Sequence, residues 1–156
     1  MLIQYHQMRL IVHADGGSRG NPGPAAYGVV VEDESGKQIV RLGKTLGIRT
    51  NNQAEYSGVI AALEFIKKLI SSGNEIAAAE FYLDSDLLVN QLSGKYKIKS
   101  PELAILAIKA KNLEKEILVS VIYKYVPREQ NKLADKIVNQ VLDSKIPVYE
   151  TNFSQS

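Results

Sequence analysis

The sequence predicts an α/β fold in which helices cover both faces of a mixed β-sheet. Segments with strand and helix periodicity follow one another in the order β-β-β-α-β-α-α-β-α. A chain of 156 residues with 45% hydrophobic content fits one globular domain with an ordinary core. Because parallel strands joined through helices have right-handed crossovers, we expect helices on both faces of the sheet.

The first part of the chain predicts an antiparallel meander. Residues 9–15, 25–33 and 37–47 have the composition of strands, and ESGK forms a tight turn between the last two. Asp15 is expected to end the first strand. The stretch GGSRGNPGP that follows is read as a loop.

The rest of the chain alternates helices with two strands. From Asn51, apolar residues recur at helical spacing up to the sequence SSGN, which predicts a long helix. Ser100 and Pro101 are typical of the N-cap and first turn of another helix. The remaining expected elements are a strand at 79–84, a short helix at 85–94, a helix at 100–116, a strand at 118–126 and a helix at 131–143.

We expect residues 9–143 to form the folded domain. Residues 1–8 read as a short N-terminal extension, although a first strand that starts at Leu2 is an alternative. Residues 144–156 read as a C-terminal tail, in which Val148 and Tyr149 would add a packing contact. The chain has no signal-peptide pattern and no apolar run approaching about 18 residues, so we expect a cytoplasmic protein that does not bind a membrane.

Composition and charge restrict the ligands. The chain has no cysteine, which excludes disulfides and thiolate metal sites and favours hard cations held by oxygen. Residues 95–132 carry nine Lys and Arg against four Asp and Glu, so this segment has a net charge of +5 within a chain of net charge +2. Such asymmetry suits binding of a polyanion on one side and of metal cations on the other. A solvated face of lysines is the alternative.

Four acidic residues are candidates for a metal site. Asp15 and Asp84 each end a predicted strand, and parallel neighbours would place both side chains at the same carboxyl edge. Glu55 lies in the first turn of a predicted helix, and Asp135 lies one turn inside the last one. Carboxylates within about 4 to 6 Å raise each other's pKa unless a cation neutralises them. The cluster therefore predicts bound metal.

Each acid also has an ordinary structural interpretation. Asp84 would serve as a turn former or helix cap, and Glu55 would favour the positive end of its helix. Asp135 would be one of the acids that helices commonly carry, and GGSRGNPGP would be a loop without a ligand. His13 is given no role and is expected to point away from the site.

Four motifs, taken together, resemble the type 1 ribonucleases H. They are DGGSRGNPGPAAYG, TNNQAEYSGVIAAL, LDSDLLVNQLSGKYKIKS and VPREQNKLADKIVN, and the resemblance runs from residue 9 to about residue 143. It implies a ribonuclease H-like fold with a five-stranded mixed sheet in the order 3-2-1-4-5. It also implies hydrolysis of the RNA strand of RNA/DNA hybrids, which leaves 5′-phosphate and 3′-hydroxyl ends.

The resemblance implies that Asp15, Glu55, Asp84 and Asp135 hold two Mg²⁺ ions, with Mn²⁺ as a substitute. Asp15 at the centre of the sheet edge would bridge both ions. Glu55 and Asp84 would serve the leaving-group side, and Asp135 the nucleophile side. Small residues beside Asp15 would let the backbone approach the 2′-hydroxyls of the RNA strand. The substrate-binding residues implied are Gly16, Gly17, Asn21, Thr50, Asn51, Asn52, Ser85, Lys95, Lys97 and Arg128.

The sequence departs from the family in three ways that bear on the substrate. It lacks the long basic insertion with which some members grip the DNA strand after GKYKIKS, where Lys95, Lys97 and Lys99 would supply part of that grip or only keep the loop soluble. Asp86 stands where many members have an amide, and VPREQNKLAD has no loop histidine, which leaves Arg128 or Glu129 as stand-ins. We expect a monomer that binds RNA/DNA hybrid, with double-stranded RNA as a further partner. A catalytically weak module that binds hybrid or double-stranded RNA is the alternative, and a resolvase of the same fold is a third interpretation.

Overall fold

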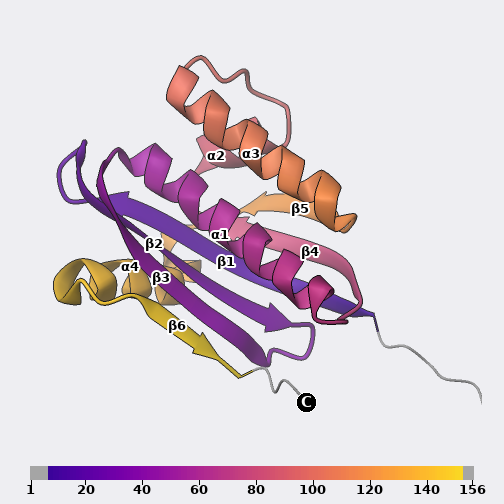
Figure 1. The fold of residues 1–156 in the computed structure, drawn as a ribbon. Helices are drawn as coiled ribbons and strands as arrows, with labels where there is room; N and C mark the ends of the chain where they lie inside the picture. Colours follow the sequence, from indigo (N-terminus) through magenta and orange to yellow (C-terminus); the bar gives the residue numbers. More distant parts are fainter. Residues whose placement is uncertain (1–6, 153–156) are drawn as a thin grey trace, which may run out of the picture.

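The computed structural model describes residues 7–152 and places one mixed sheet between helices on its two faces (Figure 1). The sheet has six strands in the order β5-β4-β1-β2-β3-β6. Strands β1, β2 and β3 form the expected antiparallel meander, and β4 and β5 run parallel to β1. The strands are β1 Met8–Ser18, β2 Gly23–Asp33, β3 Gln38–Arg49, β4 Ile76–Leu83, β5 Ser120–Tyr125 and β6 Val148–Thr151.

The predicted five-stranded sheet is wrong by one strand. β6 lies within the segment expected to be a tail and pairs antiparallel with β3, from Gly43↔Val148 to Val40↔Thr151. The five strands in the order 3-2-1-4-5 are present inside this larger sheet. A four-residue strand is too short for its periodicity to be visible in the sequence. The domain boundaries stay a prediction, and the alternative first strand from Leu2 begins outside the described residues.

Helices α1 and α3 cover one face of the sheet, and α4 covers the other (Figure 1). The long α1 begins with a capping box in which Thr50 and Gln53 exchange side-chain and backbone hydrogen bonds. None of the helices in the described part of the chain is long and apolar enough to cross a membrane. The helices are α1 Asn51–Ser71, α2 Asp86–Leu92, α3 Pro101–Ile117 and α4 Lys132–Ser144, with a short 3-10 turn at Arg128–Gln130.

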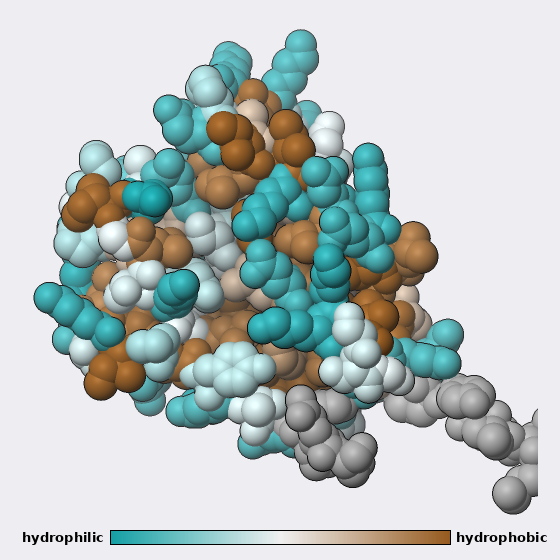
Figure 2. Space-filling model, viewed as in Figure 1, coloured by the Kyte–Doolittle hydropathy of each residue, from teal (hydrophilic) through white to brown (hydrophobic). Residues whose placement is uncertain are grey.

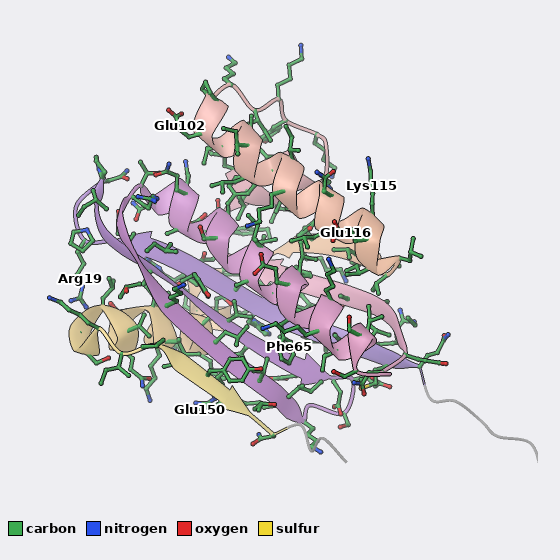
Figure 3. The ribbon with its side chains drawn as sticks, viewed as in Figure 1. Arg19, Phe65, Glu102, Lys115, Glu116 and Glu150 are labelled. Carbon is green, nitrogen blue, oxygen red and sulfur yellow. The ribbon has the colours of Figure 1, made fainter. Side chains whose placement is uncertain are left out.

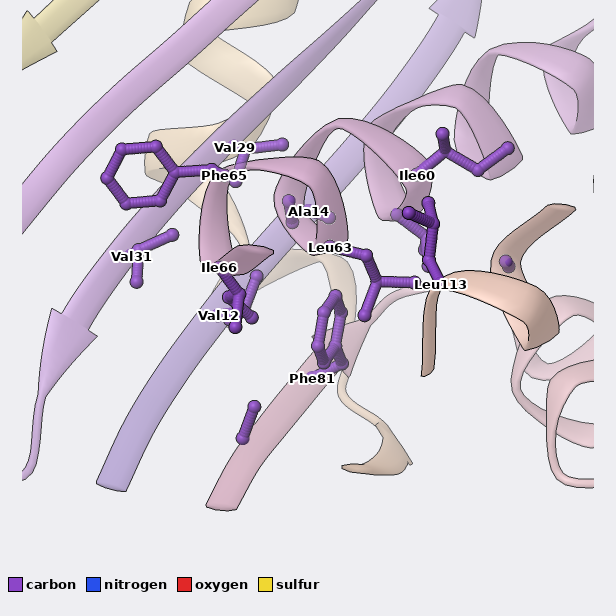
Figure 4. Close-up of a cluster of buried hydrophobic side chains, with 14 of the residues drawn as sticks. Val12, Ala14, Val29, Val31, Ile60, Leu63, Phe65, Ile66, Phe81 and Leu113 are labelled. Carbon is purple, nitrogen blue, oxygen red and sulfur yellow. The ribbon is translucent and has the colours of Figure 1, made fainter. Parts of the chain in front are cut away.

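The sheet separates two hydrophobic cores. The larger one lies under α1 and α3, where Leu63 and Ile66 of α1 meet Val12 and Phe81 of the sheet (Figure 4). The smaller one lies under α4 and includes Val30, Ile137 and Val141. Burial on both faces fixes which side chains of β1 point toward each helix layer.

The outer surface is mostly hydrophilic. Figure 2 shows charged and polar residues over much of one face, with apolar residues gathered over α3. Ile105 and Ile108 of α3 are among the exposed large apolar residues. Side chains cover the helices and sheet edges in Figure 3, where Lys115 and Glu116 mark the C-terminal end of α3.

Strand β1 is longer than predicted. It continues through Asp15 to Ser18, because the glycines after Asp15 pair with β2 and do not form a loop. His13 and Asp15 therefore lie two residues apart in one continuous strand and share a face of the sheet. His13 lines a different pocket from the one that Asp15 borders, and its expected orientation away from the site stays a prediction.

Candidate active site

The register of β1 and β4 places two carboxylates side by side. The last parallel pair is His13↔Tyr82, so Asp15 and Asp84 follow it at matching positions beyond the paired strands. Ligand oxygens of Asp15, Glu55 and Asp84 all lie within 4.8 Å of one another. The prediction that strand ends bring these acids together is confirmed, even though β1 does not end at Asp15.

Gly16 allows Glu55 to join this group. A Cβ at Gly16 would lie 2.2 Å from the Ala54 carbonyl carbon and 2.4 Å from the Glu55 backbone nitrogen. Only glycine lets the first turn of α1 approach β1 this closely. We had expected Gly16 to leave room for substrate, but the packing of α1 already requires it. At Gly17 a Cβ would meet only ordinary contacts at 3.9 Å or more, so packing does not explain that glycine.

Asp135 reaches the group from α4 on the other face of the sheet. It lies outside the compact set of three carboxylates, yet it is close enough for its charge to raise the pKa of Asp15, and it borders the same pocket. The helix can come this close because Gly28, the β2 partner of Asp15, leaves room for the Ala134 carbonyl. The structure thus brings the four predicted acids to one edge of the sheet.

Burial is the main cause of the unusual electrostatics. It raises the pKa of Asp15 from 3.8 to about 8, with a further increase from the charge of Asp84. Burial likewise raises the pKa of Glu55 from 4.5 to about 7, while a hydrogen bond from Ser85 opposes the rise. The predicted repulsion between acids is present but second to desolvation.

Arg128 is the cation nearest to the acids among the described ion pairs at this edge. Its Nε lies 3.9 Å from Asp84 Oδ2, with the arginine side chain 79% exposed. Desolvation by burial raises the pKa of Asp84, and the charge of Arg128 opposes that rise. An exposed guanidinium beside buried carboxylates is free to turn toward a phosphate without losing buried contacts.

The donor set fits divalent metal ions. The side chain of Asp15 is buried, and the Oε2 atom of Glu55 is buried without a hydrogen-bond partner. A buried carboxylate oxygen without a donor costs free energy that a bound cation would recover. Oxygen ligands from a few carboxylates are typical of Mg²⁺ sites. Asp15, Glu55 and Asp135 border an open pocket of about 440 Å³ that Gly17, Asn51 and Arg128 also line.

The expected groove-reading amides form a connected group. Asn21 Oδ1 accepts a hydrogen bond of 3.0 Å from the Asn51 backbone, and Asn51 Oδ1 accepts one of 2.8 Å from the Ser18 backbone. These bonds use the side-chain oxygens and leave the amide N–H groups to other acceptors. Asn52 is half-buried in the first turn of α1.

The other expected substrate residues have local roles or lie apart. Thr50 and Ser85 are the N-caps of α1 and α2. Lys95 and Lys97 are exposed after α2 and do not line the carboxylate pocket. Among the pocket residues that were not predicted are Arg19 and Asn139, because an isolated arginine in a glycine-rich stretch and an amide on a helix give no distinctive signal. Figure 3 shows Arg19 beside α4, where it pairs with Asp143 at 2.6 Å.

Buried carboxylates at the edge of a mixed sheet flanked by helices define the class of ribonuclease H-fold proteins. Residues 13–141 match the family model described as reverse transcriptase-like. The chain belongs to this family and, within it, to the type 1 ribonucleases H.

Several similar proteins carry that name. Ribonuclease HI of Halobacterium salinarum is 40% identical over 144 residues, which cover 85% of this chain and 64% of that protein. The structure of LC11-RNase H1 in complex with RNA/DNA hybrid has 36% identity and a TM-score of 0.82, over 87% of this chain and 98% of that one. Bifunctional protein Rv2228c of Mycobacterium tuberculosis is 40% identical over 88% of this chain, which spans only 36% of that relative.

Proposed function

We propose that this protein is a metal-dependent endoribonuclease that hydrolyses the RNA strand of RNA/DNA hybrids. The observation that carries the proposal is the close group of buried Asp15 and half-buried Glu55 and Asp84, with an unpartnered Glu55 oxygen at the carboxyl edge of the sheet. Similarity to LC11-RNase H1, whose structure contains an RNA/DNA hybrid, supports the choice of substrate.

In the proposed reaction the four acids hold two Mg²⁺ ions, with Mn²⁺ as a substitute. Bound ions would activate water and stabilise the leaving oxygen of an in-line displacement at phosphorus. Asp15 would contact both ions, Glu55 and Asp84 the one on the leaving-group side, and Asp135 the one on the nucleophile side. The products would carry 5′-phosphate and 3′-hydroxyl ends.

The residues around the acids would position the hybrid. Gly17 allows the β1 backbone to approach the sugar edge, where the 2′-hydroxyl distinguishes RNA from DNA. Asn21, Asn51 and Asn52 would read the minor groove, and Arg128 would contact a phosphate near Asp84. Additional contacts would come from Gly16, Thr50, Ser85, Lys95 and Lys97. Double-stranded RNA as a second binding partner, a monomeric state and a cytoplasmic location stay predictions.

Cleavage of labelled duplexes tests the proposal. RNA/DNA, RNA/RNA and DNA/DNA duplexes are incubated with the protein and Mg²⁺ or Mn²⁺, and the ends of the products are analysed. We expect cleavage of the RNA strand of the hybrid. Asp15→Asn should lower turnover by several orders of magnitude and leave hybrid affinity nearly unchanged, because it disturbs the metal ligands and not the groove surface.

Glu116→Gln is the matched control, because Glu116 is an exposed α3 carboxylate paired with Lys67. It should retain wild-type turnover. Hybrid binding without cleavage by the wild type would instead support a catalytically weak binding module. Near-native activity of Asp15→Asn would remove the two-metal assignment.

A further inference from the structure

Asn131 is a buried amide between β1 and the start of α4. Its side chain is among the few buried polar ones, with 1% of the residue exposed. Asn131 Nδ2 donates a hydrogen bond of 2.9 Å to the Ala14 carbonyl, and Asn131 Oδ1 lies 3.2 Å from His13 Nδ1. Because an amide oxygen only accepts, the imidazole donates this bond through Nδ1–H.

This amide does not cap its own helix. Asn131 occupies the N-cap position of α4, but its side chain makes no capping hydrogen bond. The N-caps of α1, α2 and α3 all do so, through Thr50, Ser85 and Ser100. An asparagine cap contributes about 0.5 to 2 kcal/mol to a helix. In α4 that local stabilisation is absent. The side chain of Asn131 instead forms hydrogen bonds that link the start of the helix to β1.

The contacts of Asn131 and His13 lead to the backbone positions of three of the four acids, Asp15, Asp84 and Asp135. Ala14, whose carbonyl accepts the amide bond, directly precedes Asp15. The backbone carbonyl of Asn131 accepts the first α4 hydrogen bond, of 3.1 Å, from Asp135. The imidazole of His13 stacks on Tyr82 of β4 with ring centroids 5.3 Å apart, and Tyr82 lies two residues before Asp84.

We propose that Asn131 is a positioning residue that fixes Asp135 against Asp15 and Asp84, with His13 as its support. The inference rests on the proposed function and adds a residue that does not touch metal or substrate. Packing at Gly28 sets how closely α4 approaches the sheet. The two directional bonds of Asn131 also oppose sliding and withdrawal of the helix end.

The effect on metal binding should be large for a residue outside the ligand set. Catalytic groups must be held to within about 0.5 Å of their productive positions. Loss of a hydrogen-bonding partner behind metal ligands typically lowers metal affinity or activity by about 10- to 100-fold. A purely structural asparagine would instead lower only the stability of the fold.

Three variants separate these roles. Asn131→Ala removes both bonds, and His13→Phe keeps an aromatic ring against Tyr82 but removes the donor to Asn131. Tyr123→Phe is the control, because it removes a hydrogen bond of 2.5 Å to Glu114 between β5 and α3, away from α4. For each protein, the Mn²⁺ concentration that gives half of the maximal rise in Tm is measured, along with kcat and KM on hybrid at a temperature where the protein is folded.

For Asn131→Ala, the Mn²⁺ concentration that gives half of the maximal rise in Tm should increase by about 10- to 100-fold. Its kcat should fall by a similar factor, with KM for hybrid nearly unchanged. His13→Phe should change the Mn²⁺ concentration and kcat in the same directions but by smaller factors, because Asn131 keeps its hydrogen bond to the Ala14 carbonyl. Tyr123→Phe should lower Tm alone. Wild-type Mn²⁺ dependence and wild-type kcat in folded Asn131→Ala and folded His13→Phe would overturn the inference. If Asn131→Ala does not fold, His13→Phe decides it by the same measurements.

The same measurements distinguish a failure of the proposed endoribonuclease activity from a failure of the role proposed for Asn131. A wild type that binds Mn²⁺ but does not cleave the hybrid would overturn the proposed activity. The Mn²⁺ dependence of Tm in the variants would still decide whether Asn131 positions the acids, because that measurement needs no substrate.

Discussion

Asp15 of β1 pairs directly with Gly28 of β2, and a Cβ at Gly28 would lie 2.3 Å from the Ala134 carbonyl oxygen. The glycine therefore determines how closely α4 approaches the central acid. Since Asp135 follows Ala134, the same contact sets the separation of Asp135 from Asp15. A position with no functional group thus controls the geometry of the site.

Gly28→Ala should move α4 away from the sheet and weaken the site. The added methyl group overlaps backbone atoms, which cannot move as a flexible side chain does, so we expect a loss of about 1 to 3 kcal/mol in the free energy of unfolding. Activity should fall more than tenfold at a temperature where the variant is folded. Urea unfolding and hybrid cleavage measure the two effects.

Gly36→Ala is the control for that prediction. Gly36 lies in the β2–β3 turn with a φ of +86°, and nothing lies within 4 Å of a Cβ placed there. Backbone strain should lower its stability by about 1 kcal/mol without changing kcat. Equal loss of kcat in both variants would mean that activity follows stability and not the position of α4.

The sequence was sufficient to predict the elements that have strong periodicity and the acids at their ends. Asp15 and Asp84 could be placed together because parallel neighbouring strands align their carboxyl ends. The role of Gly28 could not be predicted, because it depends on which helix crosses β2 at that residue. β6 was missed because four residues carry little periodic signal. Asn131 was missed because an asparagine before a helix normally indicates a cap.

The lysines after α2 provide a test of duplex binding. Lys95, Lys97 and Lys99 are exposed around Tyr96, which is itself 48% exposed. Replacing the three lysines with alanine should weaken binding to any duplex and reduce the slope of log K against log salt by up to about three. Lys115→Ala, at an exposed position on α3, is the control and should leave the slope unchanged. An unaltered slope in the triple variant would show that these lysines are only solvated.

β6 should stabilise the fold without serving the reaction. Val148 is half-buried against the small core under α4, where it pairs with Gly43. Val148→Ala should lower the free energy of unfolding by about 1 kcal/mol, which corresponds to the loss of two partly buried methyl groups. Glu150→Ala, at an exposed position of the same strand, should have little effect on stability. A large loss of kcat in folded Val148→Ala would instead connect β6 to the acids.

The raised pKa values of Asp15 and Glu55 make the metal-free site unfavourable at neutral pH. Asp15 changes from an ordinary pKa of 3.8 to about 8 on folding, and Glu55 from 4.5 to about 7. The folded protein therefore binds more protons than the unfolded chain between pH 4 and pH 8. The stability that Asp15 and Glu55 contribute is fully present below their unfolded pKa values, near pH 4. It is lost as the pH rises through their folded pKa values of about 8 and about 7.

Asp15→Asn should accordingly make the metal-free protein more stable while it abolishes turnover. At neutral pH the wild type must either keep a charge in a buried acidic cluster or hold a proton that the unfolded chain releases, and asparagine removes both costs. We expect the free energy of unfolding to increase by about 1 to 3 kcal/mol at pH 7 in the presence of chelator. This increase corresponds to removal of about one or two units of the pKa shift at Asp15. The gain should shrink as the pH falls to about 4 and below, because the unfolded chain then also takes up protons at these carboxyl groups. Millimolar Mg²⁺ should raise the Tm of the wild type more than that of the variant, because the ions bind only the folded acids.

Thermal melts at both pH values, with Glu116→Gln as the control for loss of one negative charge, measure these effects. A variant less stable than the wild type in chelator would mean that Asp15 is stabilised by its neighbours, and the four acids would then not form the strained cluster on which the metal site depends.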